Sequence, residues 1–115
     1  TGRMHKAGVK VLAGSDFSDW AVVPGVDLHN ELALLVEAGF SPMEALRSAT
    51  ALPAEFLGKA AEFGTVEPGK VADLVLLDAD PLESISHTRK IRAVILGGRY
   101  IDVVKTREAM AQPRN

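Results

Sequence analysis

Residues 8–16 read Gly-Val-Lys-Val-Leu-Ala-Gly-Ser-Asp, a short, mostly apolar run that ends in two small residues and a carboxylate. The β-branched and aliphatic side chains favour a buried strand. In parallel α/β folds the strand ends and the loops after them face the ligand crevice. We therefore expect a strand over residues 8–16 that delivers Asp16 to a functional edge. The alternative stays open that Ser15 and Asp16 merely start a turn, because both residue types bond local backbone.

The composition of the chain describes a single soluble globular domain or a piece of a larger one. It has 115 residues, 47% of them hydrophobic, and a net charge of −2. No basic stripe interleaved with aromatic residues is present, so we expect no nucleic-acid partner. No apolar run approaches the roughly 20 residues that cross a bilayer, and we expect no membrane partner. The absence of cysteine excludes disulfides and thiolate metal sites and suits a cytoplasmic location.

Two irregular or incomplete segments flank the expected strand. Residues 1–7 look like the last turn of a helix that Gly8 ends, with no start signal before them, so the chain looks cut. Residues 17–26 contain Pro24 and Gly25 and predict a loop beside Asp16. Trp20 in this loop either lines a substrate pocket or pins the loop to the core, and the second role is the commoner one for tryptophan.

Two helices are predicted after this loop. Residues 27–38 carry apolar side chains at helical spacing, with Asp27 as the cap and Gly39 at the end. Residues 41–44 read Ser-Pro-Met-Glu, a cap, a first-turn proline and a capping-box glutamate, and open a second helix that Pro53 restarts or kinks. The residues expected in the core of this part are Leu28, Leu32, Leu35, Val36, Met43, Leu46, Ala49, Phe56 and Leu57.

From Glu62 onward the pattern changes to strands. Residues 67–70 read Glu-Pro-Gly-Lys and predict a type II turn. Residues 72–78 predict a buried strand, and residues 91–96 and 99–104 predict two strands joined by a primed turn at Gly97 and Gly98. A short helical pattern follows Lys105.

Four stretches, taken in order, carry a family resemblance. Residues 7–16, residues 28–32 (Leu-His-Asn-Glu-Leu), residues 38–50 (Ala-Gly-Phe-Ser-Pro-Met-Glu-Ala-Leu-Arg-Ser-Ala-Thr) and residues 64–75 (Gly-Thr-Val-Glu-Pro-Gly-Lys-Val-Ala-Asp-Leu-Val) follow one another along the chain. Together they resemble the carboxyl-terminal portion of a metal-dependent amidohydrolase. The resemblance is to the branch that includes imidazolonepropionase-like enzymes and prolidase-like dipeptidases, and it runs from residue 7 to about residue 103.

The resemblance implies an α/β fold made of two portions. Residues 1–60 would be the end of a (β/α)₈ barrel, with residues 8–16 as its eighth strand and residues 27–58 as the helices after it. Residues 61–105 would supply the terminal strands of a small composite β-sandwich, and residues 106–115 would be a tail. Gly69, Lys70 and Asp73 would then belong to a sandwich turn and be structural.

The resemblance also implies a chemistry for Asp16. In this family the acid at the end of strand eight binds the metal and acts as the proton shuttle. A metal-bound water must lose a proton to attack an amide carbonyl, and the departing amine must gain one. The implied function is a metal-dependent hydrolase of carbon–nitrogen bonds in an amide, a cyclic amide or a dipeptide, with a divalent metal, zinc by expectation.

The other metal ligands that the family uses are not in this sequence. The family has a His-x-His pair on strand one, a carboxylated lysine or Glu on strand four and histidines on strands five and six. Here His5, His29 and His87 lie 24 and 58 residues apart, without metal-ligand spacing. We expect His5 to be exposed and His87 to be a surface residue. His29 either touches substrate or, by the general odds for a lone histidine, packs or caps its helix.

Several expectations follow for the chain by itself. A single carboxylate cannot hold zinc against water, so the chain alone should bind no metal and be inactive without the upstream barrel strands. A barrel strand deprived of neighbours has open edges, which predicts a homo-oligomer.

Two other function classes are compatible with an α/β chain of this length. The alternative is a free-standing α/β ligand-binding or interaction module without catalysis, in which Asp16 is a turn residue. A nucleotide-binding protein would need a glycine-rich phosphate loop, but residues 13–16 offer one glycine and a negative charge.

Overall fold

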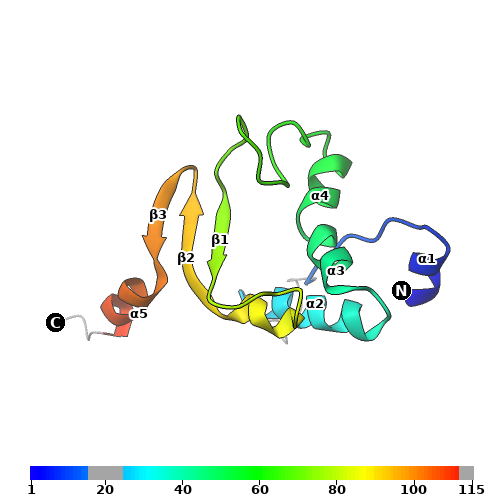
Figure 1. Cartoon of the computed structure of the whole chain (residues 1–115), viewed down its shortest axis with the longest axis horizontal. Helices are drawn as coiled ribbons and strands as arrows, with labels where there is room; N and C mark the ends of the chain where they lie inside the picture. Colours follow the sequence, from blue (N-terminus) through cyan, green and yellow to red (C-terminus); the bar gives the residue numbers. More distant parts are fainter. Residues whose placement is uncertain (16–24, 112–115) are drawn as a thin grey trace.

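The computed structural model describes residues 1–15 and 25–111, which form a helical part and a sheet part (Figure 1). The helical part comprises α1 (Gly2–Lys6), α2 (Asp27–Glu37), α3 (Pro42–Ser48) and α4 (Ala51–Phe56). The sheet part comprises β1 (Leu74–Leu77), the 3₁₀ helix η1 (Ile85–Arg89), β2 (Ile91–Leu96), β3 (Arg99–Asp102) and α5 (Val103–Ala111). The predictions for Asp16 and Trp20 lie outside the described residues.

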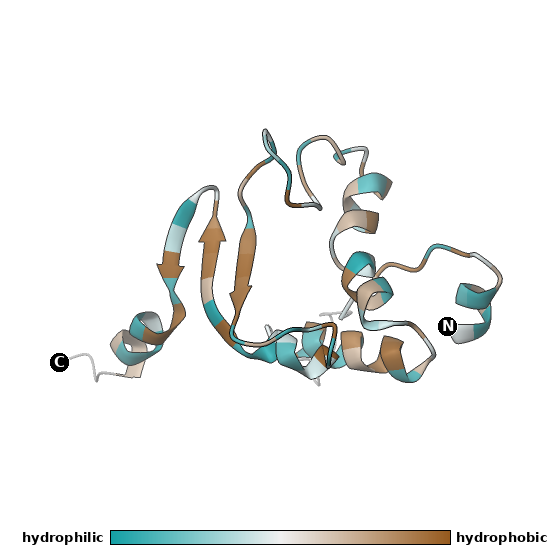
Figure 2. Cartoon of the chain, in the orientation of Figure 1, coloured by the Kyte–Doolittle hydropathy of each residue, from teal (hydrophilic) through white to brown (hydrophobic). Residues whose placement is uncertain are grey.

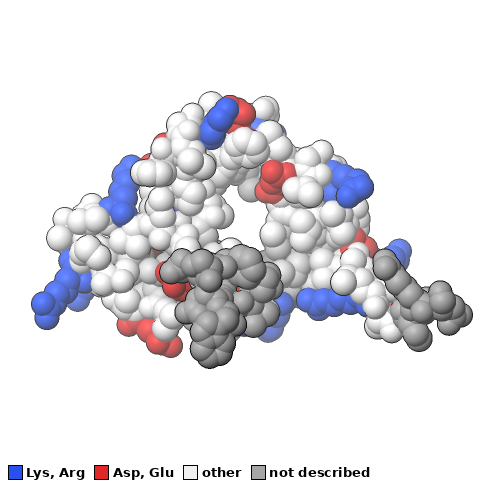
Figure 3. Space-filling model, turned by 180° about the vertical axis from the view of Figure 1, so that it is seen from behind, with Lys and Arg blue, Asp and Glu red and all other residues white. Residues whose placement is uncertain are grey.

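The two parts lie side by side and meet where η1 packs against α2 (Figure 1). The molecule extends 55 × 37 × 30 Å with a radius of gyration of 15.7 Å. A compact chain of this length has a radius of about 13 Å. Figure 3 shows an opening between the two parts. The contact between η1 and α2 is therefore an important link in holding the two parts together.

The helical part contains the main core. Leu32 and Leu35 of α2 are buried with Phe40, Ala45 and Ile85. The predicted capping box is present, because the Ser41 hydroxyl accepts from the Glu44 N–H while the Glu44 carboxylate accepts from the Ser41 N–H. The start of α3 is thus fixed by its own sequence, and the bounds of α2 agree closely with the prediction. The break expected at Pro53 lies earlier, because α3 ends at Ser48 and α4 begins at Ala51 with the proline inside it.

The inner face of α3 and the end of α4 differ from prediction. Leu28 of α2 and Met43 of α3, both expected in the core, are exposed, and α3 instead buries the small residues Ala45 and Ser48. Phe56 and Leu57, expected in the core, are 78% and 70% exposed. Small side chains let a short helix lie close against its neighbour, so the larger residues turn outward. Asp27 is also not the cap of α2: it is the first helical residue, and its Oδ1 accepts a hydrogen bond from the Asn30 side chain.

The sheet is antiparallel in the order β1-β2-β3. Gly97 and Gly98 both have positive φ, 54° and 81°, so the predicted primed turn between β2 and β3 is confirmed. The first and third strands are shorter than predicted, because β1 begins at Leu74 and α5 begins at Val103. Figure 2 shows β1 and β2 as strongly hydrophobic, yet Val75, Leu76 and Leu96 are exposed.

The segment over residues 8–15 forms no strand, contrary to prediction. A strand needs a neighbour to satisfy its backbone groups, and no strand of the described residues lies beside this segment. Val9 and Leu12 are exposed, whereas Val11 and Ala13 pack against the helical core. In the part of the chain that the structure describes, no helix has the length and apolarity to cross a bilayer.

Candidate functional site

The segment that leads to Asp16 is anchored to α3. The Ala13 N–H donates to the Ser48 carbonyl oxygen at 2.9 Å. Ser48 is itself fully buried, and its hydroxyl donates to the Ala45 carbonyl oxygen at 2.6 Å. The chain is therefore held three residues before Asp16 by a hydrogen bond to a buried point of the helical part.

His29, in the first turn of α2, contacts the sheet part. Its Nδ1 lies 3.0 Å from the Oγ1 of Thr88 in η1, and the contact is partly buried. Burial lowers the pKa of His29 below its ordinary value, and the neighbouring Arg89 guanidinium lowers it further. Both effects favour the neutral imidazole. The packing role predicted for His29 is thus present, and the structure shows its partner to be η1.

A second hydrogen bond lies beside the first. Arg89 Nη2 donates to the side-chain oxygen of Asn30 at 2.6 Å. Residues 29 and 30 of α2 thus bond residues 88 and 89 of η1, and we call these four residues the α2–η1 joint. The joint fixes the start of α2, which follows directly from the stretch that contains Asp16 and Trp20.

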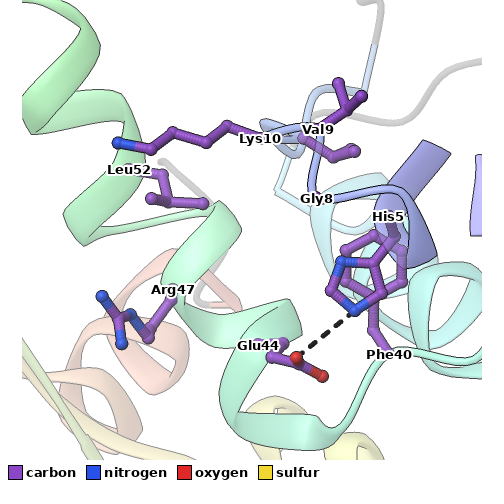
Figure 4. Close-up of a pocket in the computed structure, with 9 residues that line it drawn as sticks. His5, Gly8, Val9, Lys10, Phe40, Glu44, Arg47 and Leu52 are labelled. Atoms are coloured by element: carbon purple, nitrogen blue, oxygen red, sulfur yellow. Dashed lines mark ion pairs between the residues drawn. The ribbon is translucent and has the colours of Figure 1, made fainter.

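His5 is half-buried, so its predicted exposure is wrong. Its ring stacks on Phe40 with the ring centres 3.7 Å apart, and its Nε2 lies 3.3 Å from Glu44 Oε1 (Figure 4). The Ser41 backbone N–H does most to lower the pKa of Glu44, and the Ser41 hydroxyl and His5 lower it further, against a smaller opposing effect of desolvation. The aromatic face of Phe40, absent from any sequence pattern around His5, explains the burial.

An open pocket of about 230 Å³ lies beside this pair. Figure 4 shows His5, Lys10, Glu44 and Arg47 around it, with Phe40 and Leu52 as apolar lining. Two of its charges are used in the fold, because Lys10 pairs with Glu55 at 2.8 Å and His5 pairs with Glu44. His29, the predicted site residue that the structure describes, does not line this pocket.

The described residues do not fit a metal ion by themselves. No group of three His, Asp or Glu side chains gathers anywhere in residues 1–15 and 25–111. The three histidines use one nitrogen each in separate contacts: His5 with Glu44, His29 with Thr88, and His87 Nδ1 with the Asp80 carbonyl oxygen at 2.7 Å. A catalytic zinc site usually needs three protein ligands.

The predicted structural residues of the sheet part make structural contacts. Asp73 Oδ1 accepts from the Gly97 N–H at 2.7 Å, which ties the start of β1 to the hairpin turn. Lys70 hydrogen-bonds Thr65 and pairs with Glu67 at 3.4 Å. Gly69 has φ 89°, as the predicted turn requires.

Comparison with known proteins gives the family. The profile of the amidohydrolase family matches residues 2–101. The chain belongs to the amidohydrolase family. Its similarity to imidazolonepropionases and prolidases, predicted from the motifs, is confirmed by individual relatives.

Three relatives show the extent of the similarity. The imidazolonepropionase of Geobacillus kaustophilus is 32% identical over 103 residues, which cover 86% of this chain and 24% of that enzyme. The N-substituted formamide deformylase of Arthrobacter pascens is 33% identical over 110 residues, covering 88% of this chain and 20% of that enzyme. A Xaa-Pro dipeptidase of known structure superposes with a TM-score of 0.80 and 31% identity, covering 88% of this chain and 24% of that chain.

This amidohydrolase chain spans about a quarter of the length of the curated relatives it matches. Its similarity to the solved Xaa-Pro dipeptidase covers both the helical part and the sheet part. The similarity therefore applies to most of the chain and not to one motif.

Sequence reasoning missed the α2–η1 joint. Thr88 and Arg89 lie 59 residues after their partners, and no periodicity links the two pairs. The one usable signal was His29 itself, a titratable residue at a helix start directly after a predicted loop.

Proposed function

We propose that this amidohydrolase chain is part of a metal-dependent hydrolase that cleaves carbon–nitrogen bonds in an amide, a cyclic amide or a dipeptide. The observation that carries the proposal is the family match over residues 2–101. The relatives support the substrate class, because they include an imidazolonepropionase, a formamide deformylase and a Xaa-Pro dipeptidase. Residues 8–16 would be the eighth barrel strand, which forms its ladder once neighbouring strands lie beside it.

Asp16 is the residue of this chain that would do the chemistry. Hydrolysis of an amide needs a group that takes a proton from the attacking water and a group that gives one to the departing nitrogen. One carboxylate can perform both transfers in turn. The hydrogen bond from Ala13 to Ser48 supports this role, because it limits the movement of the backbone just before Asp16.

The metal would be held jointly by Asp16 and by ligands from protein sequence outside residues 1–115. When bound, it would supply a water of lowered pKa and polarise the substrate carbonyl. Because a catalytic zinc site usually has three protein ligands and Asp16 is the one that this chain would contribute, we expect the 115-residue chain alone neither to hold the metal nor to hydrolyse a substrate.

The proposal is tested with the complete product of the gene, loaded with Zn²⁺ and assayed against a Xaa-Pro dipeptide, an N-substituted formamide and imidazolone propionate. We expect hydrolysis of at least one of the three. Asp16→Asn keeps the size of the side chain but removes its basicity, so kcat/KM should fall about 10²- to 10⁴-fold.

Asp80→Asn is the matched control. The Asp80 side chain accepts a local hydrogen bond from the Leu82 N–H at 2.8 Å, which an amide oxygen can also accept. Its kcat/KM should stay within about twofold of the parent. Equal activity of the Asp16→Asn and Asp80→Asn variants would refute the assigned role of Asp16, and no hydrolysis of any of the three substrates would refute the substrate class.

A further inference from the structure

The hydrogen bonds of Thr88 determine which nitrogen of His29 carries the proton. The Thr88 hydroxyl donates to the Ile85 carbonyl oxygen at 2.8 Å, so its single hydrogen is already used. Toward His29 Nδ1, 3.0 Å away, the same oxygen can only accept. His29 must therefore donate from Nδ1–H.

The other ring nitrogen is then an acceptor. In the neutral imidazole, a proton on Nδ1 leaves a lone pair on Nε2. Burial and the neighbouring Arg89 lower the pKa of His29 and so favour this neutral form. Because Thr88 is buried, water does not compete for its hydroxyl oxygen. The tautomer of His29 is therefore set by the fold.

The Nε2 atom is accessible. It has no hydrogen-bond partner among the described residues. Within the same residues no buried polar side-chain atom lacks a partner, so Nε2 is not a buried orphan and must reach solvent. The imidazole thus has one nitrogen fixed by the fold and one nitrogen open to a ligand.

The position of His29 favours a substrate contact. It lies in the first turn of the helix that follows the Asp16 loop, and in barrels of this kind the loops after the strands and the adjoining helix starts form the catalytic face. We propose that Thr88 holds His29 in the Nδ1–H tautomer, and that the His29 Nε2 lone pair accepts a hydrogen bond from an N–H donor of the substrate. Thr88 is then a positioning residue and His29 a specificity-determining residue, and the substrate contact rests on the proposed function.

The tautomer is tested on the 115-residue chain by ¹⁵N–¹H NMR of the imidazole rings at pH 8. We expect Nδ1 of His29 to resonate as a protonated nitrogen and Nε2 as an unprotonated one. In Thr88→Val, which keeps the shape but removes the acceptor, the ring should return to the tautomer mixture of free histidine. In Thr88→Ser the fixed tautomer should remain. A protonated Nε2 or a tautomer mixture in the parent chain would overturn the assignment.

The substrate contact is tested on the complete gene product with two substrates, Gly-Pro and N-acetylproline. Both present an acyl–proline bond, but only Gly-Pro carries an N–H donor. The quantity measured is the ratio of kcat/KM for Gly-Pro to kcat/KM for N-acetylproline. A smaller fraction of folded or metal-loaded enzyme lowers both values equally and leaves the ratio unchanged. His29→Asn keeps a donor for Thr88 at the Nδ1 position and removes the Nε2 acceptor, so the preference for Gly-Pro should fall about tenfold.

His87→Asn is the matched control for the kinetic test. His87 also contacts an oxygen through Nδ1, but it lies in η1 and its partner is the Asp80 backbone. Its substrate ratio should not change. An unchanged ratio in His29→Asn would overturn the substrate contact and leave His29 a purely structural residue. Hydrolysis of neither substrate would overturn both the contact and a dipeptide substrate, while the NMR result would still decide the tautomer.

Discussion

Leu35 of α2 is 2% exposed, whereas Leu96 at the end of β2 is 57% exposed, although both are leucines in regular elements. Leu35 finds its partners close by in sequence, since Phe40 and Ala45 pack against it after a short turn. The sheet has both outer strands open and exposes Val75 and Tyr100 as well. The helical part thus brings Leu32, Leu35, Phe40 and Ala45 together in one core, whereas large apolar residues on all three strands of the sheet stay exposed.

The largest expected effect is on the helical core. Leu35→Ala removes a buried side chain and should lower the free energy of unfolding by about 2–5 kcal/mol. Leu96→Ala, the matched change in the sheet, should cost less than about 1 kcal/mol. Urea unfolding followed by circular dichroism measures both. Similar losses in the two variants would show that the sheet face is covered in solution and would remove the contrast between the two parts.

The connection between α4 and β1 offers the next test. Gly64 has φ 95°, and an added Cβ would lie 2.8 Å from Ala54 Cβ and 3.0 Å from Ala51 Cα. Gly64→Ala should therefore destabilise the chain by about 2–4 kcal/mol through strain and overlap. Gly69 has a similar φ of 89° but open space around it, so Gly69→Ala should cost only about 1–2 kcal/mol. Comparing the thermal unfolding of the two variants separates the cost of steric overlap at residue 64 from the cost of backbone strain, which both share. Equal losses of stability would mean that α4 does not pack on residue 64.

A smaller effect is expected at the start of α3. Ser41→Ala removes the side chain that accepts from the Glu44 N–H and should cost about 1 kcal/mol. Ser41→Asn supplies another good capping side chain and should recover most of the loss. The unfolding midpoint in urea is the measurement. A loss in Ser41→Asn as large as that in Ser41→Ala would show that the hydroxyl matters for something other than capping.

The smallest effect is the pH dependence of the α2–η1 joint. The pKa of His29 is lowered in the folded chain, so the unfolded chain binds this proton more readily. The stabilisation is complete above the ordinary histidine pKa of about 6.5 and is lost as the pH falls below it. The melting temperature should therefore drop between about pH 7.5 and pH 5.5, and His29→Asn should reduce that drop. An unchanged drop in His29→Asn would contradict a contribution of His29 to the pH dependence.

Sequence patterns predicted the elements whose signals are local. Gly39 and the Ser41–Glu44 capping box fixed the ends of α2 and α3, and two adjacent glycines fixed the turn between β2 and β3. Each of these features depends on residues within one turn of each other. For that reason the end of α2, the start of α3 and the hairpin turn needed no knowledge of the rest of the fold.

Features that depend on distant partners were not predictable in the same way. The strand expected over residues 8–15 needs neighbouring strands, which local apolarity cannot supply. The buried face of the seven-residue α3 depends on how closely it approaches α2, and the burial of His5 depends on Phe40. The partner of His29 lies 59 residues away. The role of Asp16 came from the family resemblance and stays a prediction.

The metal content of dialysed protein, measured for the complete gene product, its Asp16→Asn variant and the 115-residue chain, tests the central claim most directly. The proposal that Asp16 completes a metal site with ligands from elsewhere predicts bound divalent metal in the first, a markedly reduced amount in the second and none in the third. Near one metal ion per 115-residue chain, or equal metal in the parent and the Asp16→Asn variant, would contradict it.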